Sequence, residues 1–205
     1  LNELVAKAHK AHLQLAIHAI GDQAMDMVLT ALEKALEEAP RKDHRHRIEH
    51  ASVLNEALIQ RLKRLGVIAS IQPHFIISDF WVIERLGLTR ARWVYPFKTL
   101  LQEGIRIAGG SDCPVDPINP LLGMYAAVAR EAFPEERITV DDALRLYTIN
   151  GAYASFEENV KGSIEAGKLA DLIVLSHDPR TVPPSKIKEI RVETTIMGGR
   201  VVYAR

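Results

Sequence analysis

The chain has 205 residues, a formal net charge of zero at pH 7 and an apolar fraction of 47%, which is enough to build a core in one large or two small domains. Interspersed acidic and basic residues provide no basic face for nucleic acid and no polybasic patch for a membrane, and no apolar run reaches the roughly 18 residues that span a bilayer. A single cysteine, Cys113, excludes an internal disulfide and fits a cytoplasmic setting.

Apolar periodicity predicts helices and strands in alternation over the first 132 residues. Helices are predicted over residues 3–12, 23–39, 54–65, 96–104 and 120–132. Strands are predicted over residues 13–17, 47–49, 67–71 and 105–108. Residues 75–95 have no steady period and predict a long loop with short helices. Alternation of this kind calls for an α/β fold, with a parallel sheet and its helices outside.

The C-terminal part changes from helical to extended periodicity. Thr139 and Asp142 have the spacing of a capping box and predict a helix that runs to Leu146, and residues 151–156 predict another short helix. After Gly162, residues 171–175 predict a strand, and residues 194–203 predict a hairpin that turns on two glycines. We therefore expect a small β-domain segment at this end.

The stretch from Gly104 to Pro117 carries the strongest chemical signal. Its short apolar strand and glycine turn deliver Asp112 just past the end of a buried strand, where ligands and catalytic groups gather in folds of alternating strand and helix. The alternative is structural: Ser111 and Asp112 cap the next helix or form a turn ahead of Pro114.

Three further strands are each followed by a histidine: His18, His50 and His74. Because the carboxyl ends of parallel strands lie on one side of a sheet, these imidazoles and Asp112 are expected to converge. Two or three imidazoles with one carboxylate suit a divalent metal such as zinc. One such histidine alone is more often a hydrogen-bonded core residue, and it is the repetition that favours a shared site.

Five motifs carry a family resemblance. They are His18-Ala-Ile-Gly-Asp22, Arg47-Ile-Glu-His50, Gln72-Pro-His74, Gly110-Ser-Asp-Cys-Pro-Val115 and Gly162-Ser-Ile-Glu-Ala-Gly-Lys-Leu-Ala-Asp-Leu172. In this order they resemble the metal-dependent amidohydrolase superfamily, in particular amidohydrolase family 3 proteins of the exoenzyme-regulator-like and N-substituted formamide deformylase-like type.

The resemblance implies the C-terminal half of a (β/α)8 barrel, strands five to eight, over residues 1–160, followed by part of a small β-sandwich over residues 161–205. It implies that His18, His50 and Asp112 bind one or two divalent metal ions, with zinc expected. Asp112 would also take a proton from the hydrolytic water, while His74 would polarise a small amide-like substrate or hold its tetrahedral intermediate. The implied reaction is hydrolysis of a C–N bond.

The sequence also departs from the family. The family's His-x-His pair and its bridging lysine or glutamate are absent, so we expect weak or no metal binding and negligible hydrolysis from this chain alone. His44-Arg-His46 has the spacing of the missing pair, but it precedes a strand and so lies at the end opposite His50. The alternative to an enzyme is a non-catalytic C-terminal fragment that serves folding, regulation or association.

Open sheet edges predict association into a homo-oligomer, because a half-barrel leaves its inner face without a partner layer. We place that inner face around Leu15, Ile48, Ala69 and Ile107.

Four other residues have two interpretations each. Asp22 either ties the His18 loop together or, as we favour, caps the helix that follows. Glu49 either accepts a hydrogen bond from a ligand imidazole or forms a salt bridge. Trp81 and Trp93 either wall an apolar substrate site or pack under a loop. Cys113, beside Asp112, is interpreted as a small apolar filler rather than as a ligand or nucleophile.

Overall fold

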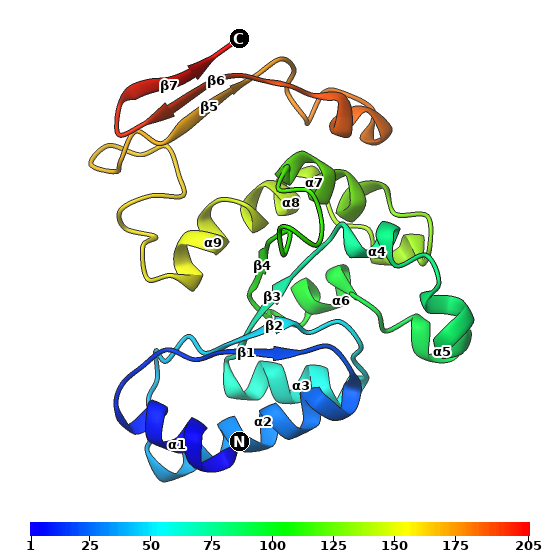
Figure 1. The fold of residues 1–205 in the computed structure, drawn as a ribbon, viewed down its shortest axis with the longest axis vertical. Helices are drawn as coiled ribbons and strands as arrows, with labels where there is room; N and C mark the ends of the chain where they lie inside the picture. The colour runs from blue at the N-terminus through cyan, green and yellow to red at the C-terminus, as the bar shows by residue number, and fades with distance from the viewer. The chain divides into compact units, whose positions relative to one another are not determined.

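The structure is a computed structural model that describes all residues from 1 to 205. Its residues divide into two compact units, residues 1–72 with 78–108, and residues 73–77 with 109–205. Helices and strands follow in chain order (Figure 1): α1 (Asn2–Lys10), β1 (Ala16–Ala19), α2 (Asp22–Glu38), β2 (Arg47–His50), α3 (Glu56–Leu65), β3 (Ile68–Ile71), α4 (Phe75–Ser78), α5 (Val82–Ala91), α6 (Phe97–Gln102), β4 (Ile107–Gly109), α7 (Pro120–Ala129), η1 (Pro134–Glu136), α8 (Val140–Leu146), α9 (Ile149–Ala154), β5 (Leu172–Leu175), η2 (Pro184–Glu189), β6 (Val192–Met197) and β7 (Arg200–Ala204).

The first four strands form one sheet in the order β1-β2-β3-β4, and β1, β2 and β3 pair in parallel. This confirms the predicted α/β class and the alternation of helix and strand. The strand β1 begins later than predicted, because residues 13–15 are held by other contacts. The Gln14 side chain donates to the Arg45 carbonyl at 2.6 Å, and the Leu15 amide donates to His46 Nδ1 at 3.1 Å.

One face of the sheet packs on helices. The register pairs Ile17 with Ile48 and Ile48 with Ala69, so these residues share a face. Helices α2 and α3 lie along one side of the strands (Figure 1), and their apolar stripes are buried. Ile48 and Ala69 are completely buried. Our assignment of these two residues to an unpartnered inner face was therefore wrong.

The opposite face of the sheet is polar. The register aligns His18 with Glu49 and Glu49 with Ser70, and alternation along β2 adds Arg47 to the same face. Arg47 Nε donates to Glu49 Oε1 at 2.5 Å, which pairs two charges two residues apart on one strand. The side chains on this face are exposed or half-buried, so the face that carries His18 is polar and lies opposite the apolar face of Ile48 and Ala69.

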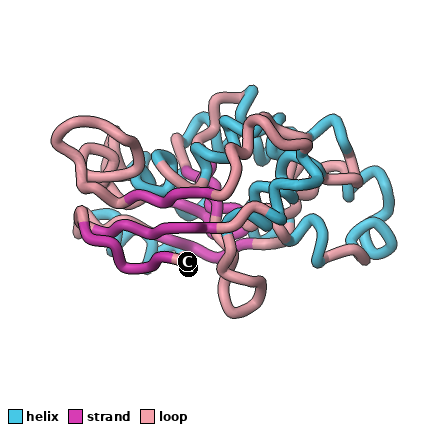
Figure 2. Tube along the Cα trace, turned by 90° about the horizontal axis from the view of Figure 1, so that it is seen from above, coloured by secondary structure: helices cyan, strands magenta, loops and turns pink.

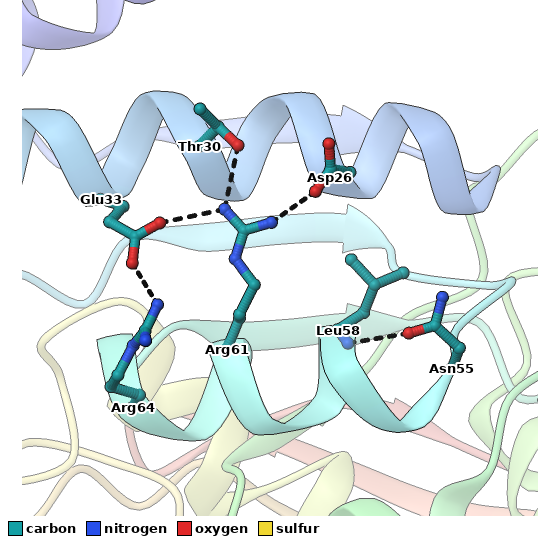
Figure 3. A network of polar contacts seen from close by, with 7 residues as sticks. All are labelled: Asp26, Thr30, Glu33, Asn55, Leu58, Arg61 and Arg64. Carbon is teal, nitrogen blue, oxygen red and sulfur yellow. Dashed lines mark hydrogen bonds and ion pairs between the residues drawn. The ribbon is translucent and has the colours of Figure 1, made fainter.

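A polar network joins α2 to α3 in the first unit (Figure 3). The guanidinium of Arg61 donates to Asp26 at 2.5 Å, to Thr30 at 3.0 Å and to Glu33 at 3.1 Å. The second oxygen of Glu33 pairs with Arg64. Three acceptors on one helix converge on a single planar cation of the next helix, which fixes the rotation of α3 beside α2.

Both ends of α3 have specific stop signals. Asn55 accepts a hydrogen bond from the Leu58 amide at 2.9 Å, which satisfies one donor of the first turn. Gly66 ends the helix in the left-handed region, at φ 66°, as predicted.

In the second unit, Tyr147 packs against two glycines. A Cβ atom on Gly109 would lie 2.9 Å from the Tyr147 ring, and one on Gly123 of α7 would lie 1.7 Å from its hydroxyl oxygen. Burial raises the pKa of the Tyr147 phenol. The two glycines therefore provide the space that the aromatic ring fills.

Gly123→Ala is expected to lower the free energy of unfolding by about 1–3 kcal/mol, because the added methyl group overpacks a buried rigid ring. Denaturant unfolding followed by circular dichroism measures this. Gly151→Ala is the matched control, since its Cβ would meet only the Leu146 carbonyl at 3.8 Å and alanine favours a helix. Adding Tyr147→Phe to Gly123→Ala should restore part of the loss, and unchanged stability of Gly123→Ala would contradict the packing argument.

The predicted capping box is present, with Thr139 accepting from the Asp142 amide at 3.1 Å and Asp142 accepting from Thr139. The C-terminal strands β5, β6 and β7 form an antiparallel sheet that ends near the C-terminus (Figure 2), and Gly198 and Gly199 make the hairpin turn at φ 56° and 78°. The domain boundary at residue 160 and the association through open edges stay predictions. None of the helices is both long and apolar enough to cross a membrane.

Candidate active site

His18 and His50 lie side by side at the carboxyl ends of β1 and β2. Their ring centroids are 4.5 Å apart with an interplanar angle of 74°. His18 is exposed, whereas His50 is buried. The backbone turns sharply here, because His50 and Ala51 both have positive φ values, 75° and 47°. Two consecutive non-glycine residues in this region are strained, and such strain concentrates at functional sites.

His44 and His46 lie at the other end of β2, just before its first residue, Arg47, as predicted. The fold uses their ring nitrogens. His46 Nδ1 accepts from the Leu15 amide, so Nε2 carries the proton and donates to His9 Nδ1 at 2.8 Å. His44 Nδ1 accepts from the His46 amide at 2.9 Å, and its Nε2 donates to the Leu65 carbonyl at 2.8 Å. These histidines are structural, and neither is free to bind a metal.

Asp112 lies in the loop between β4 and α7, in the second unit. Its backbone φ is 56°, and its exposed carboxylate forms no hydrogen bond to the protein. The structural role in this loop belongs to Ser111, whose Oγ accepts from the Cys113 amide at 3.2 Å. The next helix, α7, is capped by Asn119, which accepts from the Leu121 amide at 3.0 Å. The fold therefore leaves the carboxylate of Asp112 available for chemistry.

His74 pairs with a residue that the sequence analysis missed. Its Nδ1 lies 3.0 Å from Oδ2 of Asp116, and both residues belong to the second unit. Asp116 is 7% exposed. The available sequence signal was a second carboxylate four residues after Asp112, placed between Val115 and Pro117 inside a loop that already carried a motif.

The predicted cap at Asp22 was wrong. The N-cap position of α2 is Gly21, and Asp22 is the first helical residue. One carboxylate oxygen of Asp22 accepts from the Gln23 amide at 3.0 Å, and the other pairs with Arg90 of α5 at 2.9 Å. An acidic residue in the first turn is still favourable, because it faces the positive end of the helix dipole.

The remaining candidates have structural contacts. Glu49 forms the salt bridge with Arg47 that was one of its two interpretations. Trp81 is exposed with the Arg85 guanidinium 4.8 Å above its ring, and the Arg92 guanidinium lies 5.1 Å from the ring of Trp93. Cys113 is exposed, so it does not fill an apolar space.

The fit of a metal ion rests on the donor set. The imidazoles of His18 and His50, adjacent at neighbouring strand ends, fit two donor positions of a zinc-type site. No group of three or more His, Cys, Asp or Glu side chains in the chain is arranged to hold a metal ion. The shared site of His18, His50 and Asp112 therefore stays a prediction.

Comparisons with known proteins place the chain in a family. Residues 1–203 match the amidohydrolase family. The chain is 39% identical to YtcJ of Bacillus subtilis, provisionally named an amidohydrolase, over 100% of this chain and 40% of the relative. It is 34% identical to the N-substituted formamide deformylase of Arthrobacter pascens, over 100% of this chain and 39% of the relative.

A solved structure is also similar. A metal-dependent hydrolase from Pyrococcus horikoshii matches with a TM-score of 0.79 and 37% identity, over 89% of this chain and 38% of that chain. The chain thus spans about 40% of the length of the curated relatives. The family match extends over nearly the whole chain, and it includes the strand ends that carry His18 and His50. The chain therefore belongs to the amidohydrolase family.

Proposed function

We propose that this chain is part of a metal-dependent hydrolase that cleaves amide-like C–N bonds. The observation that supports the proposal most directly is the pair of adjacent imidazoles, His18 and His50, at neighbouring strand ends in a chain of the amidohydrolase family. We also propose that the four-stranded sheet is half of a (β/α)8 barrel, strands five to eight.

In this proposal His18, His50 and Asp112 are ligands of one or two divalent metal ions, with zinc favoured by the imidazole donors. When bound, the metal lowers the pKa of the hydrolytic water. The Asp112 carboxylate accepts the proton that this water loses, since it is exposed and not used by the fold. His74 contacts the substrate at its reacting amide.

The substrate class that we propose is a small N-substituted amide, with formamides first. The support is the similarity to the formamide deformylase of Arthrobacter pascens, together with two tryptophans, Trp81 and Trp93, near the loop that follows β3 in sequence. Since the chain spans about 40% of its relatives, catalysis by the whole protein is part of the proposal.

The alternative is a non-catalytic fragment that serves folding, regulation or association. The observation that favours it is that no group of three side chains is arranged to hold a metal ion. Zinc binding that depends on both His18 and His50 would favour the hydrolase, because a catalytic origin predicts that these two imidazoles act as ligands.

Calorimetric zinc titration should show weak binding that is lost in both His18→Ala and His50→Ala. His12→Ala is the control, because His12 is an exposed histidine of the same unit and should leave binding unchanged. Zinc affinity that is indifferent to both substitutions would overturn the ligand assignment. Hydrolysis is best assayed in the longest protein that the gene encodes, with an N-substituted formamide as substrate. Release of the amine measures cleavage of the bond between the formyl carbon and nitrogen.

A further inference from the structure

We infer that Asp116 is a positioning residue that holds a proton on Nδ1 of His74 and thereby makes Nε2 the nitrogen that meets the substrate. The inference deepens the proposed function and rests on it for the role of His74. The pairing itself rests on geometry alone. His74 Nδ1 and Asp116 Oδ2 are 3.0 Å apart, although the two residues are 42 positions apart in sequence.

The chemistry of the pair selects one tautomer. An ionised carboxylate only accepts hydrogen bonds, so Nδ1 of His74 must carry the proton that it shares with Asp116. The Asp116 side chain is only 9% exposed, so water competes little for its oxygens. A charge-assisted hydrogen bond in such surroundings is strong and fixes the plane of the imidazole.

The second nitrogen of His74 is open. Nε2 forms no hydrogen bond to the protein, and it is not among the buried side-chain atoms that lack a partner, so it is accessible to solvent. This differs from His46, where Nδ1 accepts from the Leu15 amide and Nε2 donates to His9. A histidine with both nitrogens engaged is part of the framework. His74 has one nitrogen fixed and one presented.

This tautomer changes the role that sequence resemblance implied for His74. A neutral ring protonated at Nδ1 has a lone pair at Nε2, so it accepts a hydrogen bond or a proton from the substrate. It cannot donate to a carbonyl oxygen unless it first gains a second proton. We therefore assign Nε2 to the N–H group of the substrate amide, from which its lone pair accepts a hydrogen bond, rather than to the carbonyl oxygen, to which it has no proton to donate.

The loop order explains how the pair is held. His74 follows β3 and immediately precedes α4, while Asp116 lies four residues beyond Asp112 in the loop that leads to α7. Their hydrogen bond joins two segments of the second unit, so a purely structural role as a tie between loops is the competing explanation. The test must separate a tie from an orienting contact.

Two-bond 1H–15N correlation spectra of the 15N-labelled chain report which imidazole nitrogen carries the proton. The signals of His74 are identified by their loss in His74→Gln. We expect the Nδ1-protonated tautomer in the wild type and a shift of population to the Nε2-protonated form in Asp116→Ala. Asp116→Asn is the near-isosteric second variant, in case alanine prevents folding, and should also reduce the Nδ1-protonated population.

Asp141→Ala is the matched control. Asp141 belongs to the same unit, and its carboxylate pairs with Arg180 on the surface rather than with a histidine. It should leave the His74 signals unchanged. An Nε2-protonated ring in the wild type, or an unchanged tautomer in both Asp116 variants, would overturn the inference even if the variants are less stable.

In the active protein, Asp116→Ala should lower kcat roughly 10- to 100-fold with a smaller change in KM, as for other residues that orient a working imidazole. A protein that never hydrolyses amides would refute the proposed function while the tautomer measurement still tests the pairing. A tautomer that changes as expected, with kcat unchanged, would show that the pair exists but does not position a catalytic group, and would overturn the assigned role.

Discussion

Asp112→Asn should reduce turnover of the active protein by about two to four orders of magnitude, the usual range for a group that transfers a proton in the rate-limiting step. Asparagine keeps the approximate shape of the side chain but cannot accept the proton. The fold should tolerate the change, because the carboxylate is exposed and no backbone amide depends on it. Steady-state kinetics with zinc present measures the loss.

Ser111→Ala is the control from the same loop. Its hydroxyl oxygen accepts a hydrogen bond from the Cys113 amide at 3.2 Å. Removing this hydroxyl loosens the turn but leaves the carboxylate that would take up the proton of the water. Turnover near that of the wild type is expected. An Asp112→Asn variant that keeps more than about a tenth of wild-type turnover would exclude Asp112 from proton transfer.

The second large effect is acid destabilisation of the first unit. Burial, with His44, Arg41 and His9 nearby, lowers the pKa of His46 from 6.5 to about 3. Burial likewise lowers the pKa of His44, with Arg41 and His9 adding to the shift while its bond to the Leu65 carbonyl and the Asp43 carboxylate oppose it.

The sign of the effect follows from which state binds the proton. Below pH 6.5 the unfolded chain protonates His46 while the folded chain does not, so stability is complete above about pH 6.5 and is lost as pH falls towards 3. At about 1.4 kcal/mol per pKa unit, the loss amounts to several kcal/mol. Protonation would add a proton to Nδ1 of His46 and so break the hydrogen bond that this nitrogen accepts from the Leu15 amide.

Tryptophan fluorescence measures this unit selectively, because Trp81 and Trp93 both belong to it. Denaturant unfolding at pH 7 and at pH 4.5 should give a steep decrease in stability for the wild type. His46→Gln should be less stable at pH 7 but lose less on acidification. His12→Gln, at an exposed histidine, should keep the wild-type slope, and equal slopes for all three proteins would contradict the argument.

The alternation of helices and strands could be predicted because buried faces impose a period on the sequence. The same reasoning placed His18 and His50 at neighbouring strand ends and His46 at the opposite end of β2. It placed β1 about three residues too early, since Leu13 and Leu15 extend the apolar run, whereas Gln14 and Leu15 are held by contacts to Arg45 and His46. Periodicity assigns a residue to a face, and it does not identify a partner from another part of the chain.

Side-chain partners account for the other differences. The pairing of His74 with Asp116 spans 42 positions, and Asp22 meets Arg90 across 68. Neither pair has a local pattern in the sequence. Asp112 could be proposed from the sequence because its place after a strand and glycine turn is a local feature, whereas Asp116, four residues later, has no periodicity of its own.

The strand β2 has four residues, and different pressures act on its two ends. Before it, both ring nitrogens of His46 form hydrogen bonds with neutral groups. Selection should therefore remove most replacements of His46 because they impair folding, whatever the substrate. After it, His50 and the strained Ala51 lie at the strand end where we propose the metal site. Evolution of a new specificity can therefore rebuild the loops beyond the strand's carboxyl end while the histidine framework at its start stays unchanged. For directed evolution, the positions worth randomising and the positions to leave constant therefore lie only one short strand apart.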